Sequence, residues 1–320
     1  MNSPLLSIPG AVPADPPDER VAAHYGEPFA EQRALATGAA VVDRSNRGVV
    51  RVAGADRLRF LHSLTSQHLE KLAPGEPTEA LLLSPNGHVE HHLALVDDGE
   101  AVWAHVEPGM AAGLAEFLDR MRFLMRVEVT DETESYAVVT LTGAAPPDGA
   151  LRTTDGLLVP REQLGRDWQA RPAGLWAHEA LRIAAHRPRL GLDTDHRTIP
   201  HEAGWIDVAV HLEKGCYRGQ ETVARVENLG RPPRRLVFLH LDGSVDQLPK
   251  HGEPIELAGR TVGFVGSAAR HYELGPIGLG MVKRNVPVDE TLLAGGVAAS
   301  QEVIVSPDTG SAVKIDLRRR

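Results

Sequence analysis

The sequence has 320 residues, of which 42% are hydrophobic and 24% are charged, and its formal net charge is −9. This length and composition predict a folded protein of about two domains and exclude a wholly disordered chain. The acidic balance disfavours broad electrostatic attraction to nucleic acid or to an anionic membrane. A single cysteine excludes an intramolecular disulfide framework, and no apolar run is long enough to span a bilayer. We therefore expect a cytoplasmic, monomeric protein that binds neither nucleic acid nor membranes.

Helical and strand-like periodicities alternate along the first part of the chain. Residues 1–17, rich in proline and acidic side chains, are expected to be a flexible leader. The order of strands and helices that follows matches a split βαβ pattern and predicts an antiparallel sheet covered by helices. The predicted helices are 18–37, 54–64, 110–123 and 175–185, and the predicted strands are 47–53, 80–83, 88–96, 101–106, 127–129 and 136–141.

The pattern changes at the proline-rich stretch 231–235. Beyond it, short apolar runs separated by Gly, Pro and Asp turns replace the helical periodicity, which predicts a small all-β barrel or sandwich. We therefore divide the chain into a leader (1–17), an α+β region (18–230) with two subdomains that meet near residue 145, and a C-terminal β-domain (231–320). The predicted strands of the β-domain are 236–241, 254–257, 262–268, 277–281 and 301–305.

Cys216 lies between two glycines, just before a predicted helix that begins near Gly219. Unpaired amide groups at a helix start, together with the cations of Lys214 and Arg218, favour a thiolate over a thiol and make a cysteine reactive. Gly215 and Gly219 indicate backbone shapes or close approaches that a side chain would block. Cys216 and Lys214 are therefore our candidate catalytic residues. A lone cysteine is otherwise a small buried hydrophobic residue, so a merely packed Cys216 is the alternative.

The octet Lys-Gly-Cys-Tyr-Arg-Gly-Gln-Glu at 214–221 resembles the signature of the YgfZ-type folate-binding proteins, which are relatives of the glycine-cleavage T-protein (aminomethyltransferase). The resemblance extends over nearly the whole chain. It implies an α+β fold with subdomains around a central channel that holds tetrahydrofolate or a one-carbon derivative, followed by an antiparallel β-barrel. It also implies a role in supporting iron–sulfur client proteins, including tRNA-modifying enzymes. The motif residues are Lys214, Gly215, Cys216, Tyr217, Gly219, Gln220 and Glu221.

The same resemblance assigns Glu202 to the pterin ring of the folate, because a carboxylate can accept two parallel N–H bonds from its amino-pyrimidinone edge. Arg182 is expected either to bind the ligand or to brace Glu202. Trp176 and Trp205 have rings that can stack on a pterin or pack in the core. Lys214 is expected to hold the thiolate or to bind the folate tail.

Two departures from the T-protein pattern bear on the chemistry. T-proteins carry an Asp-Asp pair where this chain has His91-His92, and a tyrosine where it has Leu190. Neutral histidine can accept a hydrogen bond or carry a proton, but it cannot replace a carboxylate beside a developing cation. We therefore expect His91 and His92 to contact folate and the protein to act through its cysteine loop. A folate-dependent aminomethyltransferase or demethylase is the alternative, and a binding-only module is a third possibility. The His88-x-x-His91-His92 cluster has no recognisable ligand spacing, so no metal is expected.

Overall fold

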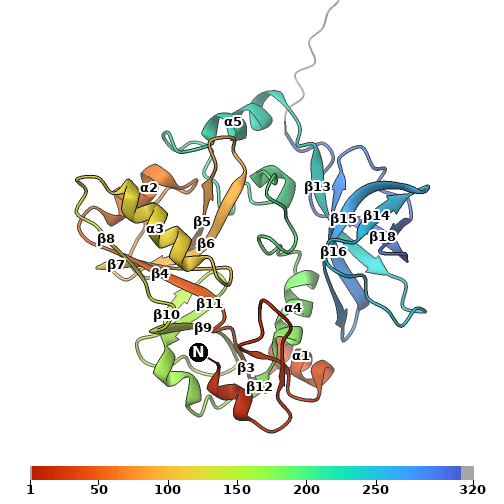
Figure 1. Ribbon diagram of the computed structural model, residues 1–320, viewed down its shortest axis with the longest axis horizontal. Coiled ribbons are helices and arrows are strands. Elements are labelled where there is room, and N and C mark those ends of the chain that lie inside the picture. Colours follow the sequence, from red (N-terminus) through yellow and green to blue (C-terminus); the bar gives the residue numbers. More distant parts are fainter. Residues whose placement is uncertain (1, 311–320) are drawn as a thin grey trace, which may run out of the picture.

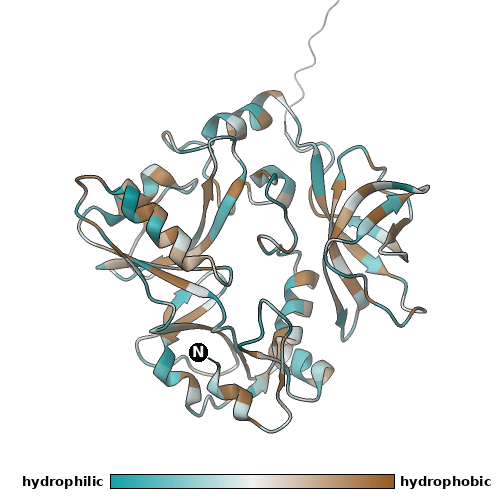
Figure 2. Ribbon diagram, in the orientation of Figure 1, coloured by the Kyte–Doolittle hydropathy of each residue, from teal (hydrophilic) through white to brown (hydrophobic). Residues whose placement is uncertain are grey.

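The computed structural model describes residues 2–310, which form two sheet-containing parts and a barrel around a central region (Figure 1). The last ten residues of the predicted β-domain lie outside the described residues. Figure 2 shows apolar residues gathered in the strands, whereas α5 (Gln220–Leu229) is largely polar. Within the described range, every helix is too short or too polar to cross a lipid bilayer.

The first sheet has the strand order β5-β6-β7-β4-β8 and is antiparallel throughout. Helices α2 and α3 cover one face, where Phe60 and Leu114 pack with apolar side chains of the strands. This arrangement confirms the predicted antiparallel sheet with its helical cover. The elements are β4 (Gly48–Ala53), α2 (Arg57–Leu64), β5 (Pro77–Leu83), β6 (Val89–Asp97), β7 (Ala101–Val106), α3 (Ala111–Met121) and β8 (Glu128–Asp131).

The second sheet has the order β10-β11-β9-β3-β12, in which β3 pairs antiparallel with β9 and parallel with β12. Its strands come from both sides of residue 145, so the predicted subdomain boundary falls inside this sheet and is wrong. The reason is that β3, early in the chain, is a central strand that needs partners from residues 136–173. The elements are α1 (Pro28–Thr37), β3 (Ala40–Asp43), β9 (Tyr136–Thr142), β10 (Leu151–Thr153), β11 (Gly156–Pro160), η2 (Arg161–Gly165), β12 (Arg171–Ala173) and α4 (Leu175–Ala184).

The N-terminal segment is folded onto the second part instead of forming a flexible leader. It contains η1 (Pro4–Ser7) and β1 (Val12–Pro13), which pairs with β2 (Ala22–His24). Leu5 is buried, and Ser3 donates a backbone hydrogen bond to Arg20. The helix predicted from residue 18 begins only at Pro28 (α1). The carboxylate of Glu31 explains the late start, because it accepts hydrogen bonds from the backbone amides of Tyr25 and Glu27 and so fixes the extended entry to the helix.

The C-terminal part is a closed, antiparallel barrel of six strands in the order β13-β16-β15-β14-β17-β18, which confirms the predicted barrel. Helix α4 packs against it through Ile183, which contacts a cluster that includes Phe238 and Leu279. Since α4 also packs on the second sheet through Ala177, it joins two of the three parts. The strands are β13 (Arg234–Leu241), β14 (Pro254–Leu257), β15 (Arg260–His271), β16 (Gly275–Lys283), β17 (Leu292–Ala294) and β18 (Val297–Val303).

Candidate functional site

A cavity of about 270 Å³ lies between the helix-free face of the first sheet and the end of α4. Alternation along the strands explains its wall. In β6, Leu93 and Leu95 pack in the core beneath α2 and α3, whereas His92 and Ala94 face the cavity. Other lining residues come from segments 185–189 and 203–208, including η3 (Pro200–Ala203) at its end. The site is therefore built from elements far apart in the sequence.

His92 and Glu79 form a hydrogen-bonded pair in the cavity wall. The Nε2 of His92 lies 2.7 Å from the Oε2 of Glu79, and the ring of Trp205 lies 5.0 Å from that of His92. The other oxygen of Glu79 accepts a hydrogen bond from Arg187 at 3.1 Å. Burial raises the pKa of Glu79, but His92 and Arg187 outweigh it and hold the pKa below its usual value. Glu79 is thus an ionised carboxylate at neutral pH.

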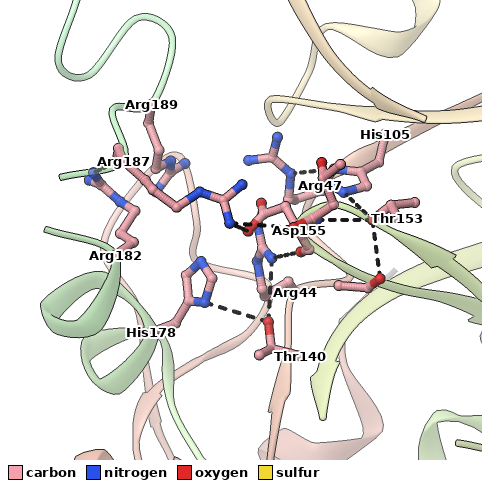
Figure 3. Close-up of polar contacts among 12 residues, drawn as sticks. Arg44, Arg47, His105, Thr140, Thr153, Asp155, His178, Arg182, Arg187 and Arg189 are labelled. Atoms are coloured by element: carbon pink, nitrogen blue, oxygen red, sulfur yellow. Dashed lines mark hydrogen bonds and ion pairs between the residues drawn. The ribbon is translucent and has the colours of Figure 1, made fainter. Parts of the chain in front are cut away.

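Arginines and carboxylates alternate around the rest of the cavity (Figure 3). Arg44 bonds Asp155 at 2.6 Å, and Arg47 bonds Glu107 at 2.7 Å. Glu107 also accepts a hydrogen bond from Arg189 at 2.9 Å. Burial alone would raise the pKa of Glu107, but Arg47 and Arg189 lower it to about 2. The carboxylates therefore compensate the buried guanidinium groups.

Arg187 differs from its neighbours because 43% of its side chain is exposed, compared with 13% for Arg189 and 6% for Arg182. Figure 3 shows it extending toward Asp155, whose nearest oxygen is 3.8 Å away. An exposed guanidinium keeps donors free for a ligand, whereas a fully paired one does not. Arg187 is thus the cation of this wall best placed to bind an anionic group.

Two further histidines in the wall are neutral at physiological pH. His105 is fully buried, and its burial, with Arg47 nearby, lowers its pKa well below the usual value. Burial, with Arg44, also lowers the pKa of His178 to about 3. A neutral imidazole can donate one hydrogen bond and accept another, so these rings supply polarity without adding charge.

Comparison with known protein families assigns the fold. The model described as the GCVT N-terminal domain matches residues 22–155, and the glycine cleavage T-protein C-terminal barrel domain matches residues 234–316. The chain belongs to the glycine cleavage T-protein superfamily.

Similar curated proteins of this T-protein superfamily carry the name aminomethyltransferase. That of Synechococcus sp. (strain WH7803) is 26% identical over 293 residues, which cover 75% of this chain and 78% of the relative. That of Rubrobacter xylanophilus is 28% identical over 295 residues, covering 79% and 78%. The crystal structure of glycine cleavage system aminomethyltransferase T from Bartonella henselae superposes with a TM-score of 0.78 at 18% identity, over 96% of this chain and 97% of that one. At this identity the likeness shows the shared fold.

The cavity contains three of the residues singled out from the sequence, His92, Arg182 and Trp205. Arg182 does not brace Glu202: its guanidinium bonds Glu179 at 2.5 Å and Asp193 at 2.9 Å. His91 lies on the opposite face of β6 from His92, as strand alternation requires, and its buried Nδ1 has no hydrogen-bond partner within the described chain.

Glu202 is placed differently from the predicted pterin contact. It is fully buried, and Arg234 donates to both of its oxygens at 2.8 Å. The backbone amide of Ile199 donates a further hydrogen bond. Its acceptor sites are thus occupied by the chain itself, and it does not line the cavity. Trp176 also lies outside the cavity, since it is half exposed and packs against His24, whereas Trp205 is in the wall.

The cysteine segment has the predicted backbone conformation, but its cations do not lie beside the thiol as predicted. Cys216 is exposed, and α5 starts directly after Gly219, whose φ of 83° and close approach to Ser84 require glycine. Gly215 has open space at its Cβ position, so no close approach explains it. Lys214 is buried, and its ammonium donates to the carbonyls of His62, Thr65 and Gln67 instead of facing the thiol.

Lys214 therefore caps the C-terminal end of α2, where carbonyl groups lack helical partners. The neighbouring motif residues contact other parts of the chain. Tyr217 is buried beside Lys214, whose Nζ lies 5.0 Å from the ring centre, and Gln220 donates to the Lys214 carbonyl at 3.4 Å. Arg218 pairs with Glu90 at 2.6 Å, and the exposed Glu221 with Arg225 at 3.6 Å, so neither reaches back to the thiol.

Sequence reasoning missed Glu79, Arg187 and the arginines around Asp155. A signal was present in β5, where Glu79 directly precedes an apolar run and shares the cavity face of the sheet with His92. The register sets Glu79 opposite Ala94, two residues from His92, close enough for a diagonal cross-strand pair. The arginines of segment 187–189 gave no such signal, because only the tertiary fold brings them to the sheet.

Proposed function

We propose that this chain binds a reduced folate in the cavity and transfers a one-carbon group, as an aminomethyltransferase or a related methyltransferase or demethylase. The observation that carries the proposal is the hydrogen-bonded pair of His92 and Glu79 in the cavity wall. Membership of the T-protein superfamily and similarity to proteins named aminomethyltransferase support it.

The lining residues fit the chemistry of a tetrahydrofolate. The ionised Glu79 can accept hydrogen bonds from the N–H groups of the pterin ring, and the indole ring of Trp205 can stack on the flat face of the pterin. Its glutamate tail carries carboxylates, for which Arg187 has free donors. A concave pocket with a small number of precisely placed polar groups is typical of a cofactor site.

The pair supplies the proton chemistry that the missing acidic pair would otherwise provide. One nitrogen of the folate displaces the carrier sulfur from the aminomethyl carbon, and its proton passes to that departing sulfur. The second folate nitrogen then displaces the amine from the same carbon, and its proton passes to Nδ1 of His92, because Nε2 donates its own proton to the ionised Glu79. Glu79 stabilises the resulting imidazolium, because it is ionised and adjacent. The imidazolium then returns the proton to the departing amine. The carboxylate thus comes from β5 instead of β6.

The test is a transfer assay with the purified chain, tetrahydrofolate and an aminomethyl donor carried on a lipoyl protein. We expect methylene-tetrahydrofolate and ammonia to form, and His92→Ala to lower the rate by about 10²-fold or more. Trp176→Ala, outside the cavity, is the matched control and retains the rate. Calorimetric titration across a folate panel measures binding independently. If no folate binds, the proposal is wrong; if folate binds without transfer, only its catalytic part is wrong.

A second candidate function is support of iron–sulfur proteins through Cys216, in the cytoplasm. The observation in its favour is that the chain's single thiol is exposed on a segment fixed by Lys214 on one side and Gly219 on the other. Complementation of a cell lacking this protein tests it. We expect Cys216→Ala to fail to restore iron–sulfur enzyme activity while retaining folate binding. Full restoration would exclude the cysteine from the function.

A further inference from the structure

We propose that the surface at the C-terminal end of α2 binds a divalent transition-metal ion such as Zn²⁺ through His62, His68 and Glu70. One potential ligand atom from each of these residues lies within 4.8 Å of the others. Imidazole nitrogen and carboxylate oxygen are ordinary zinc ligands, and bound zinc separates its ligand atoms by somewhat less than this distance. Small side-chain movements are therefore enough to close the site.

The local fold brings these side chains together. His62 is in the last turn of α2, and His68 follows in the loop, so that their ring centres are 4.8 Å apart. The ring of His211, from the start of the cysteine segment, lies 5.4 Å from that of His68. The backbone N–H of His211 donates a hydrogen bond to the carbonyl of Ser66 at 3.0 Å, which holds the start of the cysteine segment against the loop after α2. His211 can thus supply a fourth ligand.

The side chains are available for an ion. Within residues 2–310, the ring of His68 contacts the rings of His62 and His211 without a hydrogen bond, and the exposed carboxylate of Glu70 makes no hydrogen bond or ion pair. The ammonium of Lys214 lies close to His62, whose backbone carbonyl accepts a hydrogen bond from it. The carboxylate of Glu70 offsets the repulsion between Lys214 and a bound cation.

One contact limits the affinity. The Nδ1 of His62 accepts a hydrogen bond from the backbone amide of Leu69 at 3.2 Å. An ion bound at Nδ1 replaces that hydrogen bond, and an ion bound at Nε2 moves the ring proton to Nδ1, which can then no longer accept from Leu69. The site therefore holds an exchangeable ion, weaker than a closed structural zinc site. Its occupation would cross-link the end of α2 to the segment that carries Cys216.

The test uses the full chain, free of any affinity tag and stripped of metal. Zn²⁺ is titrated by calorimetry and Co²⁺ by its visible absorption, which reports ligand geometry. We expect one ion per chain, and a loss of affinity of more than about tenfold in His68→Ala. Glu70→Gln, at an exposed position that does not affect folding, weakens binding and alters the Co²⁺ spectrum. His240→Ala is the matched control, because this exposed histidine belongs to β13, where it pairs with Glu302 and contacts the ring of Phe238.

Metal binding also has a readout in stability, since an ion that binds the folded chain raises the melting temperature by mass action. We expect this rise with Zn²⁺ in the unaltered chain and in His240→Ala, and a smaller rise in His68→Ala and Glu70→Gln. The proposal is overturned if the unaltered chain binds no ion, or if both variants bind it with unaltered affinity and spectrum. Neither result bears on folate binding in the cavity.

Discussion

The Oε2 of Glu79 on β5 lies 2.7 Å from the Nε2 of His92 on the neighbouring strand β6. Because the ionised carboxylate can only accept this hydrogen bond, it fixes the orientation of the imidazole and the tautomer that carries its proton on Nε2.

The first prediction concerns this carboxylate. Glu79→Gln retains the shape and a hydrogen bond but loses the charge that stabilises the imidazolium. We expect the transfer rate to fall by about 10²-fold, while the dissociation constant for folate changes much less. Single-turnover kinetics and calorimetry separate the two quantities. Equal losses in rate and affinity would instead assign Glu79 to ligand binding alone.

The second prediction concerns Arg187, whose side chain is more exposed than those of Arg182 and Arg189 in the same cavity wall. Arg187→Gln removes a charged donor for the folate tail, so we expect the affinity for tetrahydrofolate to fall by about tenfold or more. Affinity for a pterin without the glutamate tail should be unaffected. The control is Arg152→Gln, which changes an exposed arginine on β10 that does not line the cavity. An equal loss for both ligands would contradict the assignment of the tail to Arg187.

The third prediction separates the capping role of Lys214 from a role at the thiol. Lys214→Met removes the ammonium from three backbone carbonyls and leaves them without that donor. We expect the free energy of unfolding in urea to fall by about 2 kcal/mol. The exposed Lys71 provides the control, because Lys71→Met should change the free energy of unfolding by less than about 0.5 kcal/mol. Unaltered stability together with slower alkylation of Cys216 would support activation of the thiol instead.

The fourth prediction concerns the buried ion pair of Glu202 and Arg234. Arg234→Ala leaves the carboxylate of Glu202 buried without its partner, so we expect a loss of about 3–5 kcal/mol in the free energy of unfolding. Arg231→Ala, which removes an exposed ion pair with Asp308, should cost less than about 1 kcal/mol. If Arg234→Ala were fully stable and only folate binding were lost, Glu202 would be a ligand contact after all.

The fifth prediction is a pH dependence. The folded pKa of Glu107 is about 2, below its ordinary value of 4.5, so this group stabilises the fold above pH 4.5. That contribution, about 3 kcal/mol, is lost as the pH falls from 4.5 to 2. Glu107→Gln leaves Arg47 and Arg189 without their shared anion, so the variant is less stable at neutral pH. Its stability should nevertheless fall less steeply between pH 4.5 and 2, as measured by urea unfolding at each pH. An equally steep fall would assign the acid sensitivity to other carboxylates.

Patterns with a short period predicted the fold well. The strand predicted at 101–106 has the bounds of β7, and the helix predicted at 110–123 contains α3, whose Leu114 and Leu118 pack in the core. The short apolar runs after residue 231 predicted a barrel or a sandwich, and the resemblance to T-proteins implied the barrel. Short strands such as β3 and β12 were missed, because four or three residues carry too little periodicity and their pairing partners lie far along the chain.

The candidate site was less predictable, for electrostatic reasons. Sequence proximity placed Lys214 and Arg218 beside Cys216, but a cation is drawn to the strongest available acceptors, which are the carbonyls at the end of α2 for Lys214 and Glu90 for Arg218. The pairing of His92 with Glu79 depends on strand register, which the sequence leaves open.

The position of β3 between β9 and β12 limits how early during synthesis the second sheet can form. Val41 pairs with Leu141 on one side and with Pro172 on the other, so more than half of the polypeptide must be synthesised before this strand is enclosed. A fragment that stops at residue 155, where the first matched family domain ends, would leave the β12 side of β3 bare. We therefore expect such a fragment to aggregate when expressed alone, and nascent chains of this length to need protection by chaperones.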